Sequence, residues 1–371
     1  MRICIVDPFE HGGGAEYQIS LLIEALAAAG SHEVHYLAHF LDDRPRTKNY
    51  QVSKIGSGPL PRLGYLADGP SLYRELLRID PHVIYQRVAC GYTGVCAFYA
   101  RRQAVPMVWH VAHDSDVAPT LLETARNKLR QQLEKWSVAY GARHADRIVV
   151  QTQHQAALLQ ANYGRKAAAV IPNFHPPAAE SIDKSGPFTV VWIANLKQWK
   201  QPEIFIRLAQ AFADRTDVRF IMIGAPPALT DNAQWRESLM AAIESTPNLQ
   251  FLGVQSHAQV NQLLAGAHVF VNTSLHEGFP NTFIQAWMRE VAVVSLAVDP
   301  DGVLRNSGVG LLAGSEAGLA AALRRLIDEP QTLADVAQRG RRHAEAQHSM
   351  QNSRLLVQML EGLAKDKRRA A

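Results

Sequence analysis

The sequence is poor in cysteine. Its 371 residues contain three, Cys4, Cys90 and Cys96, and no CxxC pair. An odd number of widely spaced cysteines excludes a disulfide scaffold and a cysteine-rich zinc site. A chain of this length buries a full apolar core without cross-links. We therefore expect reduced, structural thiols and a cytoplasmic protein.

An excess of charge of one sign is also missing. The chain has 38 Lys and Arg against 34 Asp and Glu, a formal net charge of +4, and charged residues make up 19% of it. Hydrophobic residues make up 47%, which is typical of a globular protein rather than a disordered one. The balance gives no reason to expect nucleic acid as a partner.

Long apolar runs are absent too. The longest candidate, residues 88–100, has 13 residues and contains two glycines, whereas a membrane span needs about 18. The apolar run at residues 3–6 is too short for a signal peptide and fits a first strand. We expect no membrane span and no secretory leader, which leaves peripheral contact at the inner face of a membrane open.

Short apolar strands alternate with helical patterns along most of the chain. In the first half the predicted strands are Met1–Val6, Glu33–His39, Val83–Gln86, Pro106–Val111 and Arg147–Gln151. After a segment rich in Pro, Ser and Ala, further strands are predicted at Thr189–Ala194, Arg219–Gly224, Leu249–Gly253, His268–Asn272 and Ala292–Ala297. This alternation predicts an α/β fold with two doubly wound parallel sheets.

The same pattern predicts the domain boundaries. We expect a first domain over residues 1–175, a linker over 176–187 and a second domain over 188–349. An amphipathic helix at about 350–371 is expected to pack back on the first domain. Because ligands bind at the carboxyl ends of parallel strands, the cleft between two such sheets is the expected site.

Three glycines, Gly12 to Gly14, follow the first predicted strand and open a helix. Without side chains, their amides can approach a ligand, and a helix N-terminus favours an anion. The motif is neither GxGxxG nor a Walker loop. The alternative is a tight turn between strand and helix.

The segment LHEGFPNTFIQ, residues 275–285, directly follows a predicted strand. Asn281 or Thr282 is expected to cap the next helix, which leaves Glu277 in the loop and its neighbouring amides ready for a phosphate. Gln285, one turn into the helix, is expected on the same side. A carboxylate beside an anion site needs donors, and sugar hydroxyls supply them. The alternative is a surface loop with a helix cap.

Two more loops at predicted strand ends carry polar side chains. Lys197 and Lys200 follow the first strand of the second half, where cations can neutralise a diphosphate or remain solvated. His110 and His113 stand at another strand end, and we expect them to hydrogen-bond a substrate or to be structural. No HExxH or third ligand accompanies them, so we predict no metal.

Together these motifs resemble glycosyltransferase family 4. The matching residues are Gly13-Gly14-Ala15-Glu16, Ala145-Asp146-Arg147 with Ile171-Pro172-Asn173, and Glu277-Gly278-Phe279-Pro280-Asn281. The last matches the start of the family's Glu-x7-Glu signature. The resemblance covers nearly the whole chain and implies the GT-B fold, two Rossmann-like domains facing across a cleft. It also implies retaining, metal-independent transfer from a nucleotide sugar.

The resemblance implies a role for each matching residue. Glu277 contacts donor-sugar hydroxyls, Lys200 binds the diphosphate, and His110 faces the sugar, with His113 as its alternative. The donor side further includes Gly13, Gly14, Asn195, Lys197, Gly278, Phe279, Pro280, Asn281, Thr282 and Gln285. Glu16, together with His113, is expected on the acceptor side.

The chain departs from the family at two positions. The second glutamate of the signature is Gln285, which can still hydrogen-bond a ribose. The arginine usual before the lysine is Asn195, which removes a positive charge near the diphosphate.

The predicted activity is transfer of a hexose from a nucleoside-diphosphate sugar to a hydroxyl of a glycan or lipid-linked glycan, with no cofactor beyond that donor. The departures leave two alternatives: a catalytically impaired protein that binds nucleotide sugar or glycan, and a nucleotide-sugar epimerase. A nicotinamide dehydrogenase is disfavoured because GxGxxG is missing.

Residues 123–147 form a basic stretch with interleaved aromatics. Its charges are Arg126, Lys128, Arg130, Lys135, Arg143 and Arg147 against Glu123, Glu134 and Asp146, with Trp136 and Tyr140 between them. Such a composition can dock on an anionic membrane, and the alternative is a solvated helix face.

Overall fold

The chain divides into two compact units, which we describe from a computed structural model. The structure describes residues 1–10, 12–30, 32–41, 49–56, 61–118, 128–229 and 231–370, without the side chains of 61–64, 128 and 366–370. The first unit comprises Met1–Phe174 and Met350–Ala371, and the second comprises His175–Ser349. The chain therefore leaves the first unit once and returns to it at the end.

The first unit is built on a parallel sheet that has seven strands among the described residues. They are β1 (Arg2–Val6), β2 (Glu33–Ala38), β3 (Gln51–Lys54), β4 (Val83–Arg87), β5 (Met107–His110), β6 (Arg147–Val150) and β7 (Ala169–Val170). The strand order is β3-β2-β1-β4-β5-β6-β7. Because β1 and β4 are neighbours, the winding direction reverses between them.

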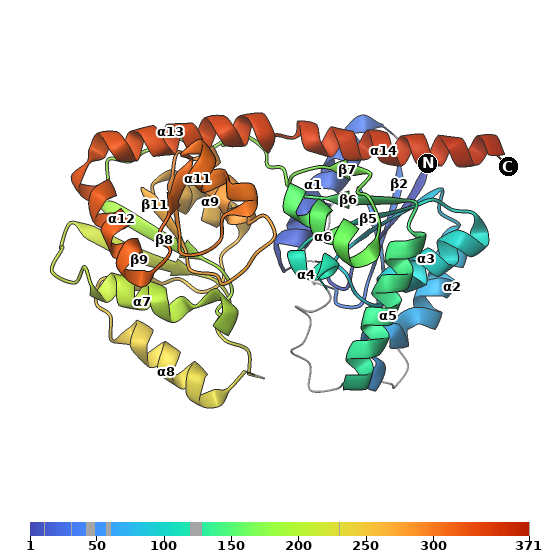
Figure 1. Ribbon diagram of the computed structural model, residues 1–371, viewed down its shortest axis with the longest axis horizontal. Helices are drawn as coiled ribbons and strands as arrows, with labels where there is room; N and C mark the ends of the chain where they lie inside the picture. The colour runs from blue at the N-terminus through green and yellow to red at the C-terminus, as the bar shows by residue number, and fades with distance from the viewer. Residues whose placement is uncertain are drawn as a thin grey trace. The chain divides into compact units, whose positions relative to one another are not determined.

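Helices cover both faces of this sheet (Figure 1). They are η1 (Pro61–Asp68), α1 (Gly14–Ala29), α2 (Gly69–Ile79), α3 (Gly91–Gln103), α4 (Asp114–Val117), α5 (Lys128–His144), α6 (Gln153–Tyr163) and α14 (Gln351–Ala370). On one face, Leu22 of α1 and Leu360 of α14 belong to one buried apolar cluster. On the other, Leu76 of α2, Ala97 of α3 and Val138 of α5 belong to another.

The second unit repeats the plan with six parallel strands in the described part of the chain. They are β8 (Phe188–Ile193), β9 (Val218–Ile223), β10 (Leu249–Phe251), β11 (Val269–Asn272), β12 (Ala292–Ser295) and β13 (Gly310–Leu312). Their order is β10-β9-β8-β11-β12-β13, so the winding direction reverses between β8 and β11.

Helices again sandwich the sheet. They are η3 (Gln198–Lys200), α7 (Pro202–Gln210), α8 (Ala233–Glu244), α9 (His257–Ala265), α10 (Asn281–Met288), η4 (Pro300–Gly302), α11 (Val303–Ser307), α12 (Glu316–Asp328) and α13 (Pro330–Gln347). Phe205 of α7 and Leu323 of α12 pack on one face, and Leu264 of α9 and Phe283 of α10 pack on the other. The fold class that the sequence predicted, two doubly wound parallel sheets, is confirmed.

Most of the segment predicted as a linker is held by the second unit. The amide of Asp183 donates to the carbonyl of Ala265 (3.3 Å), and Lys184 Nζ donates to the carbonyl of Leu264 (3.2 Å). Burial lowers the pKa of Lys184 to about 8. These contacts anchor the chain soon after it has entered this unit.

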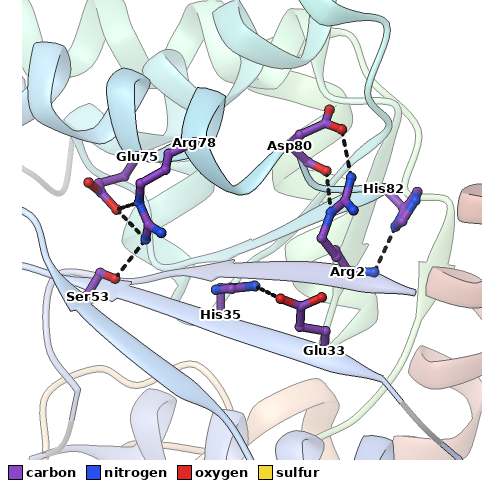
Figure 2. A network of polar contacts seen from close by, with 8 residues as sticks. All are labelled: Arg2, Glu33, His35, Ser53, Glu75, Arg78, Asp80 and His82. Atoms are coloured by element: carbon purple, nitrogen blue, oxygen red, sulfur yellow. Dashed lines mark hydrogen bonds and ion pairs between the residues drawn. The ribbon is translucent and has the colours of Figure 1, made fainter.

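The amino ends of the first sheet are fastened by a polar network (Figure 2). Arg2 donates to the carboxylate of Asp80 (2.7 Å), and its backbone amide donates to His82 Nδ1 (2.7 Å). Asp80 ends α2 with a φ of 46°, in the left-handed region. Partly exposed ion pairs of this kind contribute at most about 1 kcal/mol each. This edge of the sheet therefore serves to hold α2 in place, which leaves the carboxyl edge for ligands.

Candidate functional site

The carboxyl ends of β8 and β11 lie at the point where the second sheet reverses its winding. In open α/β sheets, ligands bind at this position because the loops from the two strands diverge there. The loop after β8 leads to Lys200 and the loop after β11 leads to Glu277. A backbone hydrogen bond from Leu275 N to Trp199 O (2.9 Å) ties the two loops together.

Glu277 and Lys200 form an ion pair at this position. Glu277 Oε1 accepts a hydrogen bond from Lys200 Nζ and another from Ser274 Oγ (2.8 Å). The two side chains are 12% and 16% exposed, so the pair is largely withdrawn from water and still reachable. The sequence predicted both residues for a ligand site, and the structure brings them together.

The environment of Lys200 sets its charge. Burial lowers its pKa and the neighbouring Glu277 carboxylate opposes that shift, whereas Lys197 adds to it. The ammonium also lies over the ring of Trp199, 4.1 Å from the centroid. An ammonium has three donors, of which Glu277 Oε1 takes one, so Lys200 is equipped to bind an anion as well.

Buried polar residues below the ion pair hold the backbone of both loops. Thr273 Oγ1 donates to the carbonyl of Lys200 (2.6 Å) and accepts from Trp192 Nε1 (2.8 Å). Above, the rings of Trp199 and His276 stack with centroids 5.3 Å apart. These contacts hold the two loops that carry the charged pair.

The start of α10 differs from the prediction. Neither Asn281 nor Thr282 is the cap: the helix begins at Asn281, and the cap position is Pro280, which makes no side-chain hydrogen bond. Pro280 is the last extended residue of the loop, and its φ of −65° is already compatible with a helix, so the helix begins at the next residue. Gly278 and Phe279 are buried, and the Phe279 ring packs on His348 with centroids 4.4 Å apart.

The two positions that depart from the family pattern are both engaged in bonds within the second unit. Asn195 Oδ1 accepts from the amide of Ala225 (3.1 Å), beside Gly224, where a side chain would collide with the backbone of the β8 loop. Gln285 is 4% exposed, and its amide donates to Asn261 of α9 (3.2 Å). In this structure Asn195 and Gln285 thus brace neighbouring segments.

In the first unit, the glycine loop connects β1 with α1. Gly12 has a φ of 133°, which side chains rarely allow, and a side chain at Gly13 would lie 2.7 Å from Glu16 Oε2. Asp7, which is fully buried, directly follows β1, and the charge of Glu16 acts on it. Burial, followed by the charge of Glu16, raises the pKa of Asp7.

His110 lies fully buried at the end of β5. Its Nδ1 is 2.7 Å from the hydroxyl of Tyr85 and accepts from Arg87 Nη1 (3.2 Å). Burial, assisted by Arg87, lowers the pKa of His110 well below its usual range. Arg87 has only donors, so the single ring proton belongs on Nε2, for which the described residues offer no acceptor. His110 is therefore a neutral hydrogen-bond donor.

Arg87 is itself held at a strained strand end. Its Nη2 donates to Asn173 Oδ1 (2.8 Å). The next residue, Val88, has a φ of 64°, which is unfavourable for a β-branched side chain, and Gln86 Nε2 donates to its carbonyl. Such strain is concentrated at functional sites.

His113 has a different position from His110. It is the cap of α4, where its Nδ1 accepts from the amide of Ser115 (3.2 Å). Asp116 accepts from the amides of Ala112 and His113 at 2.8 and 3.1 Å, and burial raises the pKa of Asp116. His113 is therefore bound into a short capped turn.

Within the part of the chain that the structure describes, no group of three or more His, Cys, Asp and Glu residues is placed to hold a metal ion. Among the same residues, every helix is too short or too polar to span a bilayer.

Sequence reasoning missed several supporting residues. Ser274 and Thr273 gave no signal beyond their place after a strand. Asp7 and Arg87 did give one, because each is a charged residue directly attached to an apolar strand. A charge in that position must find partners in the fold.

Both halves of the chain match models of glycosyltransferase families. Residues 12–178 match "Glycosyltransferase Family 4", and residues 187–329 match "Glycosyl transferases group 1". The chain belongs to glycosyltransferase family 4. The resemblance seen in the sequence is thereby confirmed, and the GT-B fold with it.

Individual proteins similar to this glycosyltransferase agree with that assignment. D-inositol 3-phosphate glycosyltransferase of Rhodococcus erythropolis is 25% identical over 330 residues, which are 80% of this chain and 73% of that protein. The structure of Anabaena HepE in complex with UDP and glucose covers 98% of this chain and 100% of its own, with 20% identity and a TM-score of 0.76. Sucrose-phosphate synthase of Thermosynechococcus elongatus covers 98% of each chain, with 18% identity and the same TM-score.

Proposed function

We propose that this glycosyltransferase moves a hexose from a nucleoside-diphosphate sugar to a hydroxyl of a glycan or lipid-linked glycan. The observation that carries the proposal is the pair of Glu277 and Lys200 at the switch point of the second sheet. A carboxylate that is only partly hydrogen-bonded attracts hydroxyls, and an adjacent ammonium attracts phosphate. A sugar linked to a diphosphate offers both groups at neighbouring positions.

In this proposal Glu277 accepts hydrogen bonds from the donor-sugar hydroxyls. Its bond to Ser274 Oγ keeps the carboxylate oriented while the ligand binds. Gly278, Phe279 and Pro280 present backbone to the sugar, and the first amides of α10, at Asn281 and Thr282, face the phosphates.

Lys200 stabilises the diphosphate as it leaves, and Lys197 adds positive charge beside it. The bond between the sugar C1 and the diphosphate oxygen breaks, and the electron pair stays on that oxygen. Fixed positive charge at this place favours the transition state over the bound donor, so the step needs no divalent cation. Gly13 and Gly14 are proposed as further amide donors to the diphosphate.

The acceptor hydroxyl attacks C1 from the face that the diphosphate leaves, so the configuration is retained. Its proton goes to the departing phosphate oxygen, which makes a protein nucleophile unnecessary. His110, neutral and with its proton on Nε2, donates a hydrogen bond to the sugar. Glu16 and His113 are proposed on the acceptor side.

The relatives support a phosphorylated or lipid-linked acceptor as the first to test. One is named for D-inositol 3-phosphate. Another, 28% identical over 158 residues, is a phosphatidylinositol N-acetylglucosaminyltransferase subunit of Schizosaccharomyces pombe, one third of which is matched. Residues 123–147 are the proposed membrane contact, of which 123–127 lie outside the described residues.

The first experiment identifies the donor. Thermal unfolding is measured with a panel of UDP-, GDP- and ADP-sugars, because a ligand that binds only the native state raises the melting temperature. The best donor is then tested for transfer with and without EDTA, and the anomeric configuration of the product is read by NMR. Loss of transfer in EDTA, or an inverted product, overturns that part of the proposal.

The second experiment tests the site. Glu277→Ala is expected to lower transfer at least a hundredfold, whereas Glu290→Ala, the matched control, is expected to leave it unchanged. Glu290 also pairs with a basic side chain, Arg341, but it follows the far end of α10. Unchanged turnover in Glu277→Ala rejects the assignment. Donor consumption without any acceptor, yielding a second nucleotide sugar, identifies an epimerase instead.

A further inference from the structure

A pocket lies within the first unit and shares Trp136, Ser137 and Tyr140 with the basic stretch of residues 123–147. It runs along the outer side of α3 between α2 and α5 and has a volume of about 750 Å³. Volumes of this size are typical of small-molecule sites. Its walls are almost entirely apolar, which distinguishes it from a site for sugars or nucleotides.

Helix α3 packs very closely on α5 beside this groove. At Gly94 a side chain would lie 2.2 Å from Ser137 Oγ of α5, and at Gly141 it would lie 2.6 Å from Thr93 of α3. These glycines let α3 approach α5 closely. Larger side chains of all three helices line the groove, among them Leu77 of α2, Phe98 of α3 and Trp136 of α5.

Aromatic side chains, some exposed and some half-buried, line both sides of the groove. On one side the rings of Tyr73 and Phe98 are 5.9 Å apart, and on the other Trp136 stacks on Tyr140 at 6.0 Å. Phe98 is 50% exposed, Trp136 67% and Leu77, also in the groove, 48%. A contiguous exposed patch of this kind marks an interaction site.

The charge around the groove favours an anionic occupant. Helices α2, α3 and α5 carry eight Lys and Arg residues and two Asp and Glu residues, a net charge of +6 against +4 for the whole chain. Of the two acids, Glu75 pairs with Arg78, and Glu134 accepts from the amide of Tyr65. In the described part of the chain no carboxylate pairs with the exposed Arg74, Arg101 or Arg102.

We propose that the groove between α2, α3 and α5 binds the hydrocarbon chain of an anionic membrane lipid, with Arg74, Arg101 and Arg102 around its headgroup. Arg74 lines the groove, and Arg101 and Arg102 follow Phe98 by three and four residues on α3, which places them on the same side of that helix. Apolar and aromatic walls next to these cations have the same division of polarity as such a lipid. The inference deepens the proposed membrane contact of residues 123–147. It does not depend on the identity of the sugar donor or on the reaction.

The first test uses single chains rather than membranes. Monoalkyl phosphates with six to twelve carbons are titrated below their micelle concentration, with alkyl trimethylammonium ions of the same length as charge controls. A chain that enters the groove gains about fourfold in affinity per methylene until the groove is full. The phosphates are expected to follow this slope and the ammonium ions to bind at least tenfold more weakly. Absence of a chain-length dependence overturns the proposal.

The second test uses vesicles and surface variants. Wild type is expected to bind phosphatidylcholine vesicles with 30% phosphatidylglycerol and not pure phosphatidylcholine vesicles. Phe98→Ser with Trp136→Ser is expected to weaken that binding at least tenfold and to flatten the chain-length slope. Both side chains are exposed, so folding is retained. The matched control is Leu355→Ser, at an equally exposed leucine of α14.

The headgroup site is tested by Arg74→Gln, Arg101→Gln and Arg102→Gln together, against Arg354→Gln on α14 as control. The triple variant is expected to lose the preference for anionic vesicles and to keep the chain-length slope. Equal vesicle binding by wild type and the double aromatic variant overturns the proposal. So does a dimer that the aromatic substitutions dissociate, because a second copy then occupies the groove. The thermal shift with nucleotide sugar is read on every variant, so failure of donor binding is recorded separately.

Discussion

Replacing Glu277 with glutamine separates recognition of the sugar from recognition of the diphosphate. The substitution keeps the shape and the acceptor oxygen for Ser274, and it removes the negative charge that Lys200 faces. We expect the nucleoside diphosphate alone to bind more tightly to the variant than to wild type. The complete nucleotide sugar is expected to bind more weakly.

The magnitudes follow from the bonds that are exchanged. A hydrogen bond to a charged group contributes about 1.5–3 kcal/mol. We assume that binding of the diphosphate costs about half of the interaction energy between Lys200 and Glu277. Without the negative charge this cost disappears, which strengthens diphosphate binding by about 1 kcal/mol, or roughly fivefold. Losing charged acceptance of two sugar hydroxyls costs about 1.5–3 kcal/mol, which is roughly 10- to 100-fold.

The assay is isothermal titration at pH 6 with the nucleoside diphosphate and its sugar. Without the Glu277 charge, burial and Lys197 lower the pKa of Lys200 unopposed, so low pH keeps the ammonium charged. Ser274→Ala is the companion variant, because it removes one bond to Glu277 and keeps the charge. The reasoning is refuted if Glu277→Gln weakens the diphosphate threefold or more, since Glu277 then supports the phosphates and not the sugar.

Three further predictions concern the first unit. Asp7→Asn is expected to stabilise the protein more at pH 8 than at pH 5 in denaturant unfolding, because the raised pKa of Asp7 costs stability that grows as pH rises from the unfolded-state pKa to the folded-state pKa; equal effects at both values contradict this. Arg87→Met is expected to cost about 1–3 kcal/mol of stability, because Asn173 Oδ1 loses a charged donor, and to raise the pKa of His110, measured by ¹⁵N NMR, because the cation that lowers it is gone; an unchanged titration argues against the contact. Gly94→Ala is expected to lower the unfolding free energy by about 1–3 kcal/mol, since the new methyl lies 2.2 Å from α5, whereas Gly362→Ala, in open space on α14, is expected to raise it by about 0.5–1 kcal/mol; equal effects of the two exclude close helix packing as the cause.

Features encoded in a few adjacent residues could be predicted from the sequence. The apolar strands and the loops after β8 and β11 are of this kind, because the chemistry of Lys200 and Glu277 depends on their place directly after a strand. The strands β3, β7 and β13 were not predicted. Each has only two to four residues and owes its pairing to a longer neighbour.

Contacts between distant segments could not be predicted. The partners of His110 come from β4, 23 and 25 residues earlier, and Asn173 lies 86 residues from Arg87. Which side chains meet at a sheet edge depends on strand order, and strand order is a property of the whole fold. The predicted cap of α10 was wrong for a local reason. Pro280 takes the cap position, although Asn281 and Thr282 are residue types that usually prefer it.

The return of the last helix, α14, to the first unit has a consequence for biosynthesis (Figure 1). Leu356 and Leu360 of α14 complete the same apolar cluster as Ile19 and Leu22 of α1. A ribosome delivers these two groups more than 300 residues apart. During synthesis, the apolar cluster of the first unit therefore lacks its cover from α14 until the second unit has been translated. Truncation within α14 is therefore expected to uncover apolar side chains of α1 and to destabilise the first unit.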